Sequence, residues 1–203
     1  MKVLIAFTLL LCLALGSYET QDFEAELPIF MQVQPADSLY DYSLNFLKGF
    51  FISTEENRSY PLFKQCDSSW GSNTMGSKTI CQVGCLMSSM SMALNGLGKT
   101  IDGAAANPQT LNAWLKTHGG YSDNLFVWGA CTSSFSLKYL GKFTSPTNYI
   151  DDSHIVILNV HNGGHWVLAT SFASGTYQVN DPGYRTTSYT TGEVKQAAVY
   201  QIL

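Results

Sequence analysis

Cys85 is the residue of this chain best placed to act as a nucleophile. It follows Gly84 and opens an apolar run with a helical pattern that extends to Gly96. A thiol in the first turn of a helix lies against unpaired backbone N–H groups and the positive end of the helix dipole, which favours the thiolate. Attack of a thiolate on a carbonyl also requires a base, a group that orients the base, and a donor for the oxyanion.

His165 is the strongest candidate for the base. It follows Asn162-Gly163-Gly164, where glycines allow close backbone approach, and it opens a strand that continues with the apolar residues 166–168. A histidine at the start of a buried strand can face a cleft while the core fixes its backbone. The alternative is a structural role, which is also the default interpretation of the other histidines, His118, His154 and His161.

Asp181, sixteen residues after His165, is the candidate that orients the imidazole. If a three-residue turn over 172–174 closes the hairpin, residues 165 and 181 lie directly opposite each other and point to the same face. A two-residue turn at Ser174-Gly175 would instead place Asp181 opposite Leu168. Because the sequence Asn-Asp-Pro-Gly around Asp181 is also a strong turn sequence, the aspartate could simply cap that turn.

The oxyanion requires hydrogen-bond donors. One donor can be the backbone N–H of Cys85 at the helix N-terminus. A side-chain donor could be Gln82, three residues before Cys85, or Gln65, which lies before a long loop that could fold back over the site. We expect Gly84, Gly164 and Trp166, which flank the two reacting side chains, to bind substrate.

The elements that must position these residues change type along the chain. Residues 60–78 predict an ordered loop, residues 85–96 an amphipathic helix, and Asn107-Pro108 the start of a second helix. Residues 121–148 predict loops with one or two short strands. From His154 onward, short apolar segments alternate with turn sequences, which predicts antiparallel strands. This order indicates an α+β domain with the helix of Cys85 packed on a C-terminal antiparallel sheet.

The first sixteen residues have the pattern of a secretory signal peptide. Lys2 precedes an apolar run over 3–15 that is too short to span a bilayer, and small residues precede a cleavage position after Gly16. The alternatives are a short membrane anchor or a buried strand. We expect residues 17–59 to be an N-terminal extension or a removed propeptide with an amphipathic helix, and residues 60–203 to be the catalytic domain. Asn57 opens an N-glycosylation sequon, and the protein is expected to be secreted or in the secretory-pathway lumen.

Composition limits the partners and the cofactors. The chain is 45% hydrophobic, and loss of Lys2 with the signal peptide changes its net charge from −4 to −5. This acidity argues against nucleic acid or an anionic membrane as partner, so we expect a peptide or protein substrate and a monomer. Histidines and cysteines lack the paired spacings of a metal site, so no metal and no cofactor are expected. Four cysteines remain after Cys12 is lost, and the sequence alone does not pair Cys66, Cys81 and Cys131.

Several short motifs resemble the double-glycine, bacteriocin-processing cysteine peptidases. The resemblance covers roughly residues 60–203 and implies a papain-like fold with the chain order Cys, His, Asp. It implies Cys85 as nucleophile, His165 as base, Asp181 as orienting group and Gln65 as oxyanion donor, although the glutamine of this family usually stands much closer to its cysteine. The motifs are Gln65–Trp70, Met75-Gly76, Thr79-Ile80, Gly84-Cys85, Ser89-Met90, Ala93-Leu94, Pro108, Leu111, Leu115, Gly119–Tyr121, Trp128, Gly164–Leu168 and Val179–Gly183.

Taken together, these features predict a secreted cysteine peptidase that hydrolyses amide bonds through a thioester. Two alternatives remain open. One is a catalytically inactive secreted binding domain of the same fold with an aromatic contact surface, which a disulfide on Cys85 would favour. The other is an amidase or acyltransferase that acts on cell-wall or protein amides with the same residues.

Overall fold

The computed structural model describes residues 58–203, which fall within one compact unit, Glu56–Leu203. The predicted signal peptide, nearly all of the extension 17–59 and the sequon residue Asn57 lie outside the described residues. Among the helices of the described part, none is long and apolar enough to cross a membrane.

Helices come first along the described chain and long strands come last. The helices are α3 (Ile80–Val83), α4 (Cys85–Gly96) and α5 (Pro108–Thr117). The short hairpins are β1 (Thr100–Ile101) with β2 (Ala104–Ala105), and β3 (Tyr121–Ser122) with β4 (Leu125–Phe126). The strands of the main sheet are β5 (Leu137–Phe143), β6 (His154–Val160), β7 (His165–Ala173), β8 (Thr176–Asn180), β9 (Ser188–Thr190) and β10 (Gln196–Ile202).

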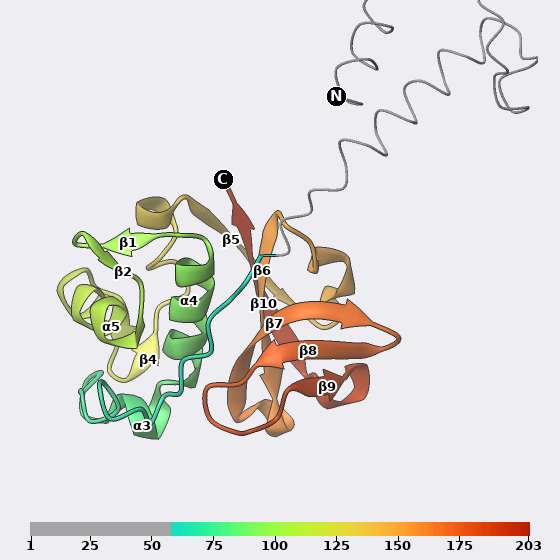
Figure 1. The fold of residues 1–203 in the computed structure, drawn as a ribbon, viewed down its shortest axis with the longest axis horizontal. Helices are drawn as coiled ribbons and strands as arrows, with labels where there is room; N and C mark the ends of the chain where they lie inside the picture. The colour runs from blue at the N-terminus through green and yellow to red at the C-terminus, as the bar shows by residue number, and fades with distance from the viewer. Residues whose placement is uncertain (1–57) are drawn as a thin grey trace, which may run out of the picture. The chain divides into compact units, whose positions relative to one another are not determined.

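The main sheet is antiparallel with the strand order β5-β10-β6-β7-β8-β9. Strands β6 to β9 follow one another as a meander, and β10 returns to lie between β5 and β6 (Figure 1). The prediction of one or two short strands over 121–148 was wrong, because β3, β4 and the seven-residue β5 all lie there. Strand β5 is hard to recognise because it is an edge strand with lysines and a glycine at positive φ.

Helix α4 is the central helix of the domain and packs against β7 (Figure 1). Its residues 86–94 are all buried, so the predicted amphipathic pattern was wrong: α5 lies against another side of the helix. Small serine and alanine side chains allow this close packing. Ser89 also donates a hydrogen bond to the carbonyl of Trp166 at 3.2 Å, which ties α4 directly to the strand that carries His165.

The buried apolar residues form two clusters, one that includes α4 and one that lies on other residues of the same sheet. Because side chains alternate along a strand, neighbouring residues of β6, β7 and β10 contribute to different clusters. This second cluster includes two buried tyrosines, Tyr177 and Tyr189, which are 1% and 3% exposed. These two residues are directly paired across β8 and β9.

The hairpin between β7 and β8 differs from the register that we predicted. Its turn is the two-residue Ser174-Gly175, with φ values of 50° and 78°, as expected for a tight hairpin turn. A bulge in β7 between Ala169 and Ser171 then shifts the register, so that Leu168 pairs with Asn180. Asp181 therefore follows the last residue of β8 and is not directly opposite His165. The three-residue turn over 172–174 was wrong, and the alternative two-residue turn at Ser174-Gly175 is the one present. The bulge, which sequence alone does not locate, places Asn180 rather than Asp181 opposite Leu168.

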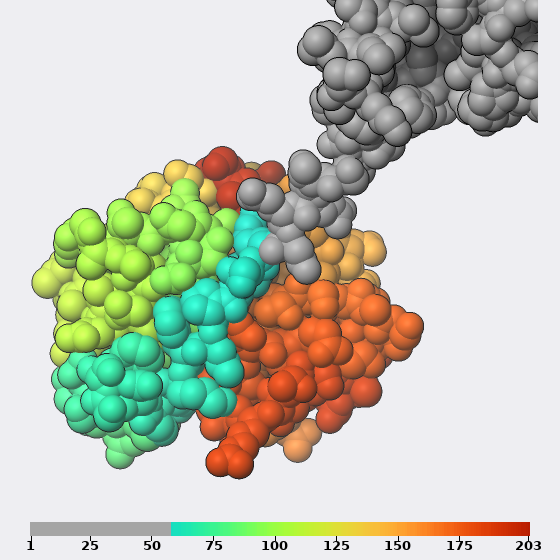
Figure 2. Space-filling view, viewed as in Figure 1, coloured from blue at the N-terminus to red at the C-terminus, as the bar shows by residue number. Residues whose placement is uncertain are grey.

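The predicted ordered loop over 60–78 is confirmed, and the chain that leads into it crosses the domain. In Figures 1 and 2 this blue-green segment runs between the helical part and the sheet. Asn180 donates from its side chain to the carbonyls of Tyr60 and Pro61 at 2.9 and 3.1 Å, and the backbone N–H of Gln65 donates to the carbonyl of Pro182 at 2.9 Å. These bonds hold the segment against the end of β8.

The start of helix α5 provides a stability test. The Asn107 side chain accepts hydrogen bonds from the backbone N–H groups of Gln109 and Thr110 at 2.9 and 3.0 Å. Asn107→Ala should therefore lower the free energy of unfolding by about 1 kcal/mol, measured by urea denaturation of the whole chain. The exposed Gln109→Ala should change it by less than about 0.5 kcal/mol. Equal midpoints for Asn107→Ala and the wild type would contradict the capping role.

Candidate active site

Cys85 is the first residue of α4, immediately after a break between two helices. Helix α3 ends at Val83, and its C-cap Gly84, with φ and ψ of −84° and 10°, separates it from α4. A Cβ on Gly84 would lie 2.5 Å from the carbonyl oxygen of Ile80, so this glycine permits the close approach of α3. Gly84 thus has a packing role, and its predicted substrate contact remains a prediction.

Within residues 58–203 the cysteines form one disulfide, between Cys66 and Cys81, and leave Cys85 and Cys131 free. The structure thus gives a pairing that the sequence alone did not assign. Cys131 is fully buried, and burial raises the pKa of its thiol to about 12. Such a thiol is unreactive at neutral pH, whereas Cys85 is half-buried and reaches the surface of a cleft.

His165 and Asp181 form a buried pair. The Nε2 atom of His165 lies 2.7 Å from Oδ1 of Asp181, and the two residues are 6% and 1% exposed. With Nε2 bound to the carboxylate, Nδ1 is the ring nitrogen left for Cys85. Burial by itself lowers the pKa of His165, but hydrogen bonds to Asp181 and Cys85 and their charges raise it to about 9.

The Asp181 carboxylate both binds the histidine and caps the turn after β8. Its Oδ1 also accepts from the backbone N–H groups of Gly183 and Tyr184, each at 2.8 Å. Its Oδ2 accepts from the hydroxyl of Tyr189 at 2.8 Å. Burial would raise the pKa of Asp181, but the hydrogen bonds from His165, the Tyr184 N–H and Tyr189 hold it below its usual value. The two interpretations of Asp181, orienting group and turn cap, are therefore compatible.

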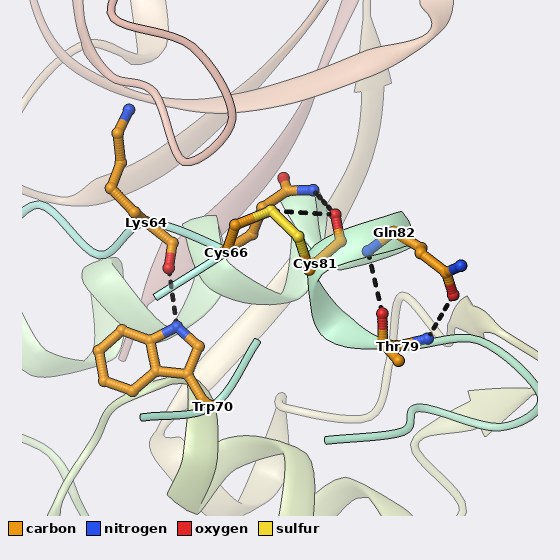
Figure 3. The surroundings of a disulfide bond; sticks show 7 residues. Lys64, Cys66, Trp70, Thr79, Cys81 and Gln82 are labelled. Atoms are coloured by element: carbon orange, nitrogen blue, oxygen red, sulfur yellow. Dashed lines mark hydrogen bonds between the residues drawn. A yellow bond between two sulfur atoms is a disulfide. The ribbon is translucent and has the colours of Figure 1, made fainter. Parts of the chain in front are cut away.

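Gln65 is brought to the site by the disulfide. Figure 3 shows the bridge from Cys66, the next residue, to Cys81, which lies four residues before Cys85. The Nε2 atom of Gln65 donates to the carbonyl of Cys81 at 2.8 Å, and the side chain is buried. Gln65 and Cys85 can therefore lie in the same cleft although they are far apart in the sequence.

Gln82 is engaged differently. Its Oε1 accepts from the backbone N–H of Thr79 at 3.0 Å, as part of a capping box at the start of α3 (Figure 3). Its side chain is exposed, although the residue also borders the cleft. Of the two candidate glutamines, Gln65 is the one held in a buried position.

A cleft of about 520 Å³ joins these residues. The predicted site residues Gln65, Cys85, Gly164, His165 and Trp166 line it, whereas Gly84 and Asp181 are not among the lining residues. One part of its wall is apolar, and Leu125, one of the lining residues, is 74% exposed. The remaining lining residues are Cys66, Met75, Cys81, Gln82, Val83, Leu86, Met87, Asn124, Leu125, Phe126, Gly183 and Tyr184.

Sequence reasoning missed two residues that support Asp181. Tyr189 binds its carboxylate, and Lys64 donates from Nζ to its main-chain carbonyl at 2.7 Å and to that of Tyr184. Gly183 was seen only as part of a turn, yet a Cβ there would lie 2.8 Å from Cε1 of His165. No sequence signal marks Tyr189 or Lys64, because both contacts depend on strand register and on the path of the segment before the disulfide.

The described residues were searched for a metal site, and the chain was compared with known proteins. Within residues 58–203, no group of three or more His, Cys, Asp or Glu side chains could hold a metal ion. No family model and no curated protein matches the chain. A solved structure of a double glycine motif protease from an AMS/PCAT transporter, in complex with the leader peptide, is similar with a TM-score of 0.47 and 13% identity, over 72% of this chain and 94% of that one. At those values the likeness says nothing of what this chain acts on.

The raised pKa of His165 predicts a pH dependence of stability. A histidine whose pKa is about 9 when folded and 6.5 when unfolded stabilises the fold fully below pH 6.5 and progressively less up to pH 9. The free energy of unfolding should therefore fall between pH 6.5 and 9, measured by urea denaturation in matched buffers. His165→Gln should flatten this part of the curve, and an equally steep curve in that variant would assign the effect to another group.

The disulfide should support both stability and the position of Gln65. Cys66 and Cys81 are separated by 15 residues. Removing a bridge of that span, in the double variant Cys66→Ser with Cys81→Ser, should cost about 3 kcal/mol of unfolding free energy and lower any Gln65-dependent turnover. Dithiothreitol should reproduce the loss in the wild type and have no further effect on the double variant. Unchanged denaturation and turnover in the double variant would contradict this role.

Proposed function

We propose that this chain is a papain-like cysteine peptidase that hydrolyses peptide bonds through Cys85, His165 and Asp181. The observation that carries the proposal is that a free thiol at a helix N-terminus and a histidine line one cleft, and that this histidine is paired with the buried Asp181. The raised pKa of His165 is consistent with an imidazolium beside a thiolate. An imidazolium can then donate its proton to the leaving group.

Acylation would begin with attack of the Cys85 sulfur on the carbonyl carbon of the scissile bond. The carbonyl oxygen becomes an oxyanion, for which the Cys85 N–H and Gln65 are the proposed donors. The Nε2 group of Gln65 has two hydrogens, and only one is required for its bond to the Cys81 carbonyl. As the tetrahedral intermediate collapses, the C–N bond breaks, His165 protonates the leaving amine and a thioester remains on Cys85.

Deacylation would use the same groups in reverse. His165, now neutral, removes a proton from water, which attacks the thioester carbonyl. This proton transfer makes His165 the imidazolium, and collapse of the second intermediate then breaks the C–S bond, releases the carboxylic acid product and leaves the Cys85 thiolate beside it. Asp181 keeps Nε2–H bound throughout, so that Nδ1 remains directed toward the sulfur.

The lining of the cleft favours a peptide substrate whose side chains next to the scissile bond are uncharged. Among the described residues that line it there is no Asp, Glu, Lys or Arg, and His165 is the one strongly basic group. The apolar part of its wall, with Met75, Met87 and Phe126, favours uncharged side chains. We also propose that the protein is a secreted monomer, and the Cys66–Cys81 disulfide is consistent with an oxidising compartment.

Labelling and product analysis test the nucleophile. The whole chain should react once with a peptidyl epoxide, and Cys85→Ala should lose both this labelling and hydrolysis of a peptide library, by at least about a thousandfold. Cys131→Ala is the matched control and should retain both if it folds, as checked by circular dichroism. Labelling that persists in Cys85→Ala would assign the reactive thiol elsewhere.

Mass spectrometry with an added amine distinguishes the three enzyme and binding hypotheses. Hydrolysis yields new peptide termini, whereas acyl transfer yields a higher-mass adduct with the amine. A binding domain would yield neither product while still retaining the peptide. The free state of Cys85 already removes the condition that would have favoured an inactive domain.

A further inference from the structure

The Asp181 carboxylate has an uneven distribution of donors. Three N–H groups, those of His165, Gly183 and Tyr184, are directed at Oδ1. A single donor, the hydroxyl of Tyr189, is directed at Oδ2 at 2.8 Å. Because the Asp181 side chain is fully buried, Oδ2 has no access to solvent. Tyr189 therefore supplies the hydrogen bond that this oxygen needs in order to remain charged in the interior.

Tyr189 is itself held by a second residue. His161 places Nε2 3.1 Å from the Tyr189 oxygen. Because the tyrosine proton points to Asp181, the tyrosine oxygen is the acceptor and His161 is the donor. The four side chains thus form one continuous chain of hydrogen bonds, from His161 through Tyr189 and Asp181 to His165.

The loop that presents His161 has unusual backbone geometry. His161 and Asn162 have φ values of 51° and 55°, a left-handed conformation that is costly for residues other than glycine. The same loop leads directly into His165. The side chain of Asn159 stabilises this loop by donating hydrogen bonds to the carbonyls of Gly163 and His165, each at 3.1 Å. Both histidines of the hydrogen-bond chain are therefore positioned by a single loop.

We propose that Tyr189 is a positioning residue of the active site, which holds Asp181 so that its Oδ1 keeps His165 directed at Cys85. This inference rests on the proposed peptidase function. Tyr189 is 3% exposed and is not among the residues that line the cleft. It acts through the orientation of the carboxylate: with Oδ2 fixed, rotation about the carboxyl bond is blocked, and Oδ1 stays at hydrogen-bonding distance from His165.

Other charged groups near this chain do not replace the tyrosine. Lys64 faces the main-chain carbonyl of Asp181 and not its carboxylate. Glu193 lies near His161 and Tyr189, where its charge acts on both. The side chain of Lys195 lies beside Gly163, which belongs to the loop that carries His161. None of these groups donates to Oδ2 within the described residues, so the loss of the tyrosine hydroxyl leaves this oxygen without a donor.

Tyr189→Phe, made in the whole chain, tests the proposal. Turnover (kcat) for a peptide cleaved by the wild type should fall roughly tenfold or more while KM changes by less than about twofold, since substrate contacts are unchanged. The pKa of His165, followed by NMR titration of its ring, should fall from its raised value because the imidazolium loses its oriented partner. A kcat within twofold of the wild type, or a His165 pKa equal to or above the wild-type value, would overturn the proposal.

Tyr177→Phe is the matched control. Tyr177 is equally buried, is paired directly with Tyr189 on the neighbouring strand, and is not among the donors to Asp181. This variant should leave kcat and the His165 titration unchanged. A loss equal to that of Tyr189→Phe would indicate a general packing effect and would also overturn the proposal.

A second variant covers the case in which Tyr189→Phe does not fold. His161→Asn suits the left-handed backbone and shortens the side chain, so that the outer donor to Tyr189 is withdrawn. It should lower kcat by about two- to fivefold and shift the His165 titration in the same direction as Tyr189→Phe. No change in either quantity would overturn the proposal. If the wild type hydrolyses no peptide, the proposed function fails, yet the NMR titrations still decide whether Tyr189 orients the Asp181–His165 pair.

Discussion

The site depends on one buried carboxylate. A charged group in a protein interior is costly unless its oxygens are paired with donors, and Asp181 obtains these donors from β7, from its own turn and from β9. Lys64, in the segment before the disulfide, binds the main chain of the same residue. The histidine is therefore oriented only when parts of the chain separated by more than a hundred residues have come together.

The other half of the site belongs to the helical part of the domain. Cys85 begins α4 after the break at Gly84, and Gln65 is attached to the same region by the Cys66–Cys81 bridge. Helix α4 and β7 connect the two halves through their packing and through the bond from Ser89 to the Trp166 carbonyl. The relative position of thiol and imidazole is thus set by a helix–sheet contact in the core, where packing leaves little freedom.

Sequence patterns predicted the types of element better than their pairing. The turn sequences after His154 indicated the antiparallel strands, and Asn107-Pro108 indicated the start of α5. The structure brings His165 and Asp181 together, but through a bulge in β7 and a turn beyond the end of β8, neither of which has a local sequence signal. Tyr189 and Lys64 could not be foreseen, because their contacts arise from β9 and from the path of residues 58–66. The burial of α4 likewise depends on its packing against α5, and the sequence of α4 alone does not reveal this contact.

The position of the disulfide also affects how the chain can change over evolution. The bridge fixes Cys66 to Cys81, so the geometry of Gln65 relative to Cys85 does not depend on how many residues lie between the two half-cystines. Loop closure becomes only slightly more costly as a loop lengthens. Insertions and deletions at the exposed positions of the loop between the half-cystines should therefore be tolerated without displacing the glutamine, whereas the buried Met75 of the same loop lines the cleft. A covalent cross-link here separates the spacing of two residues in space from their spacing in sequence.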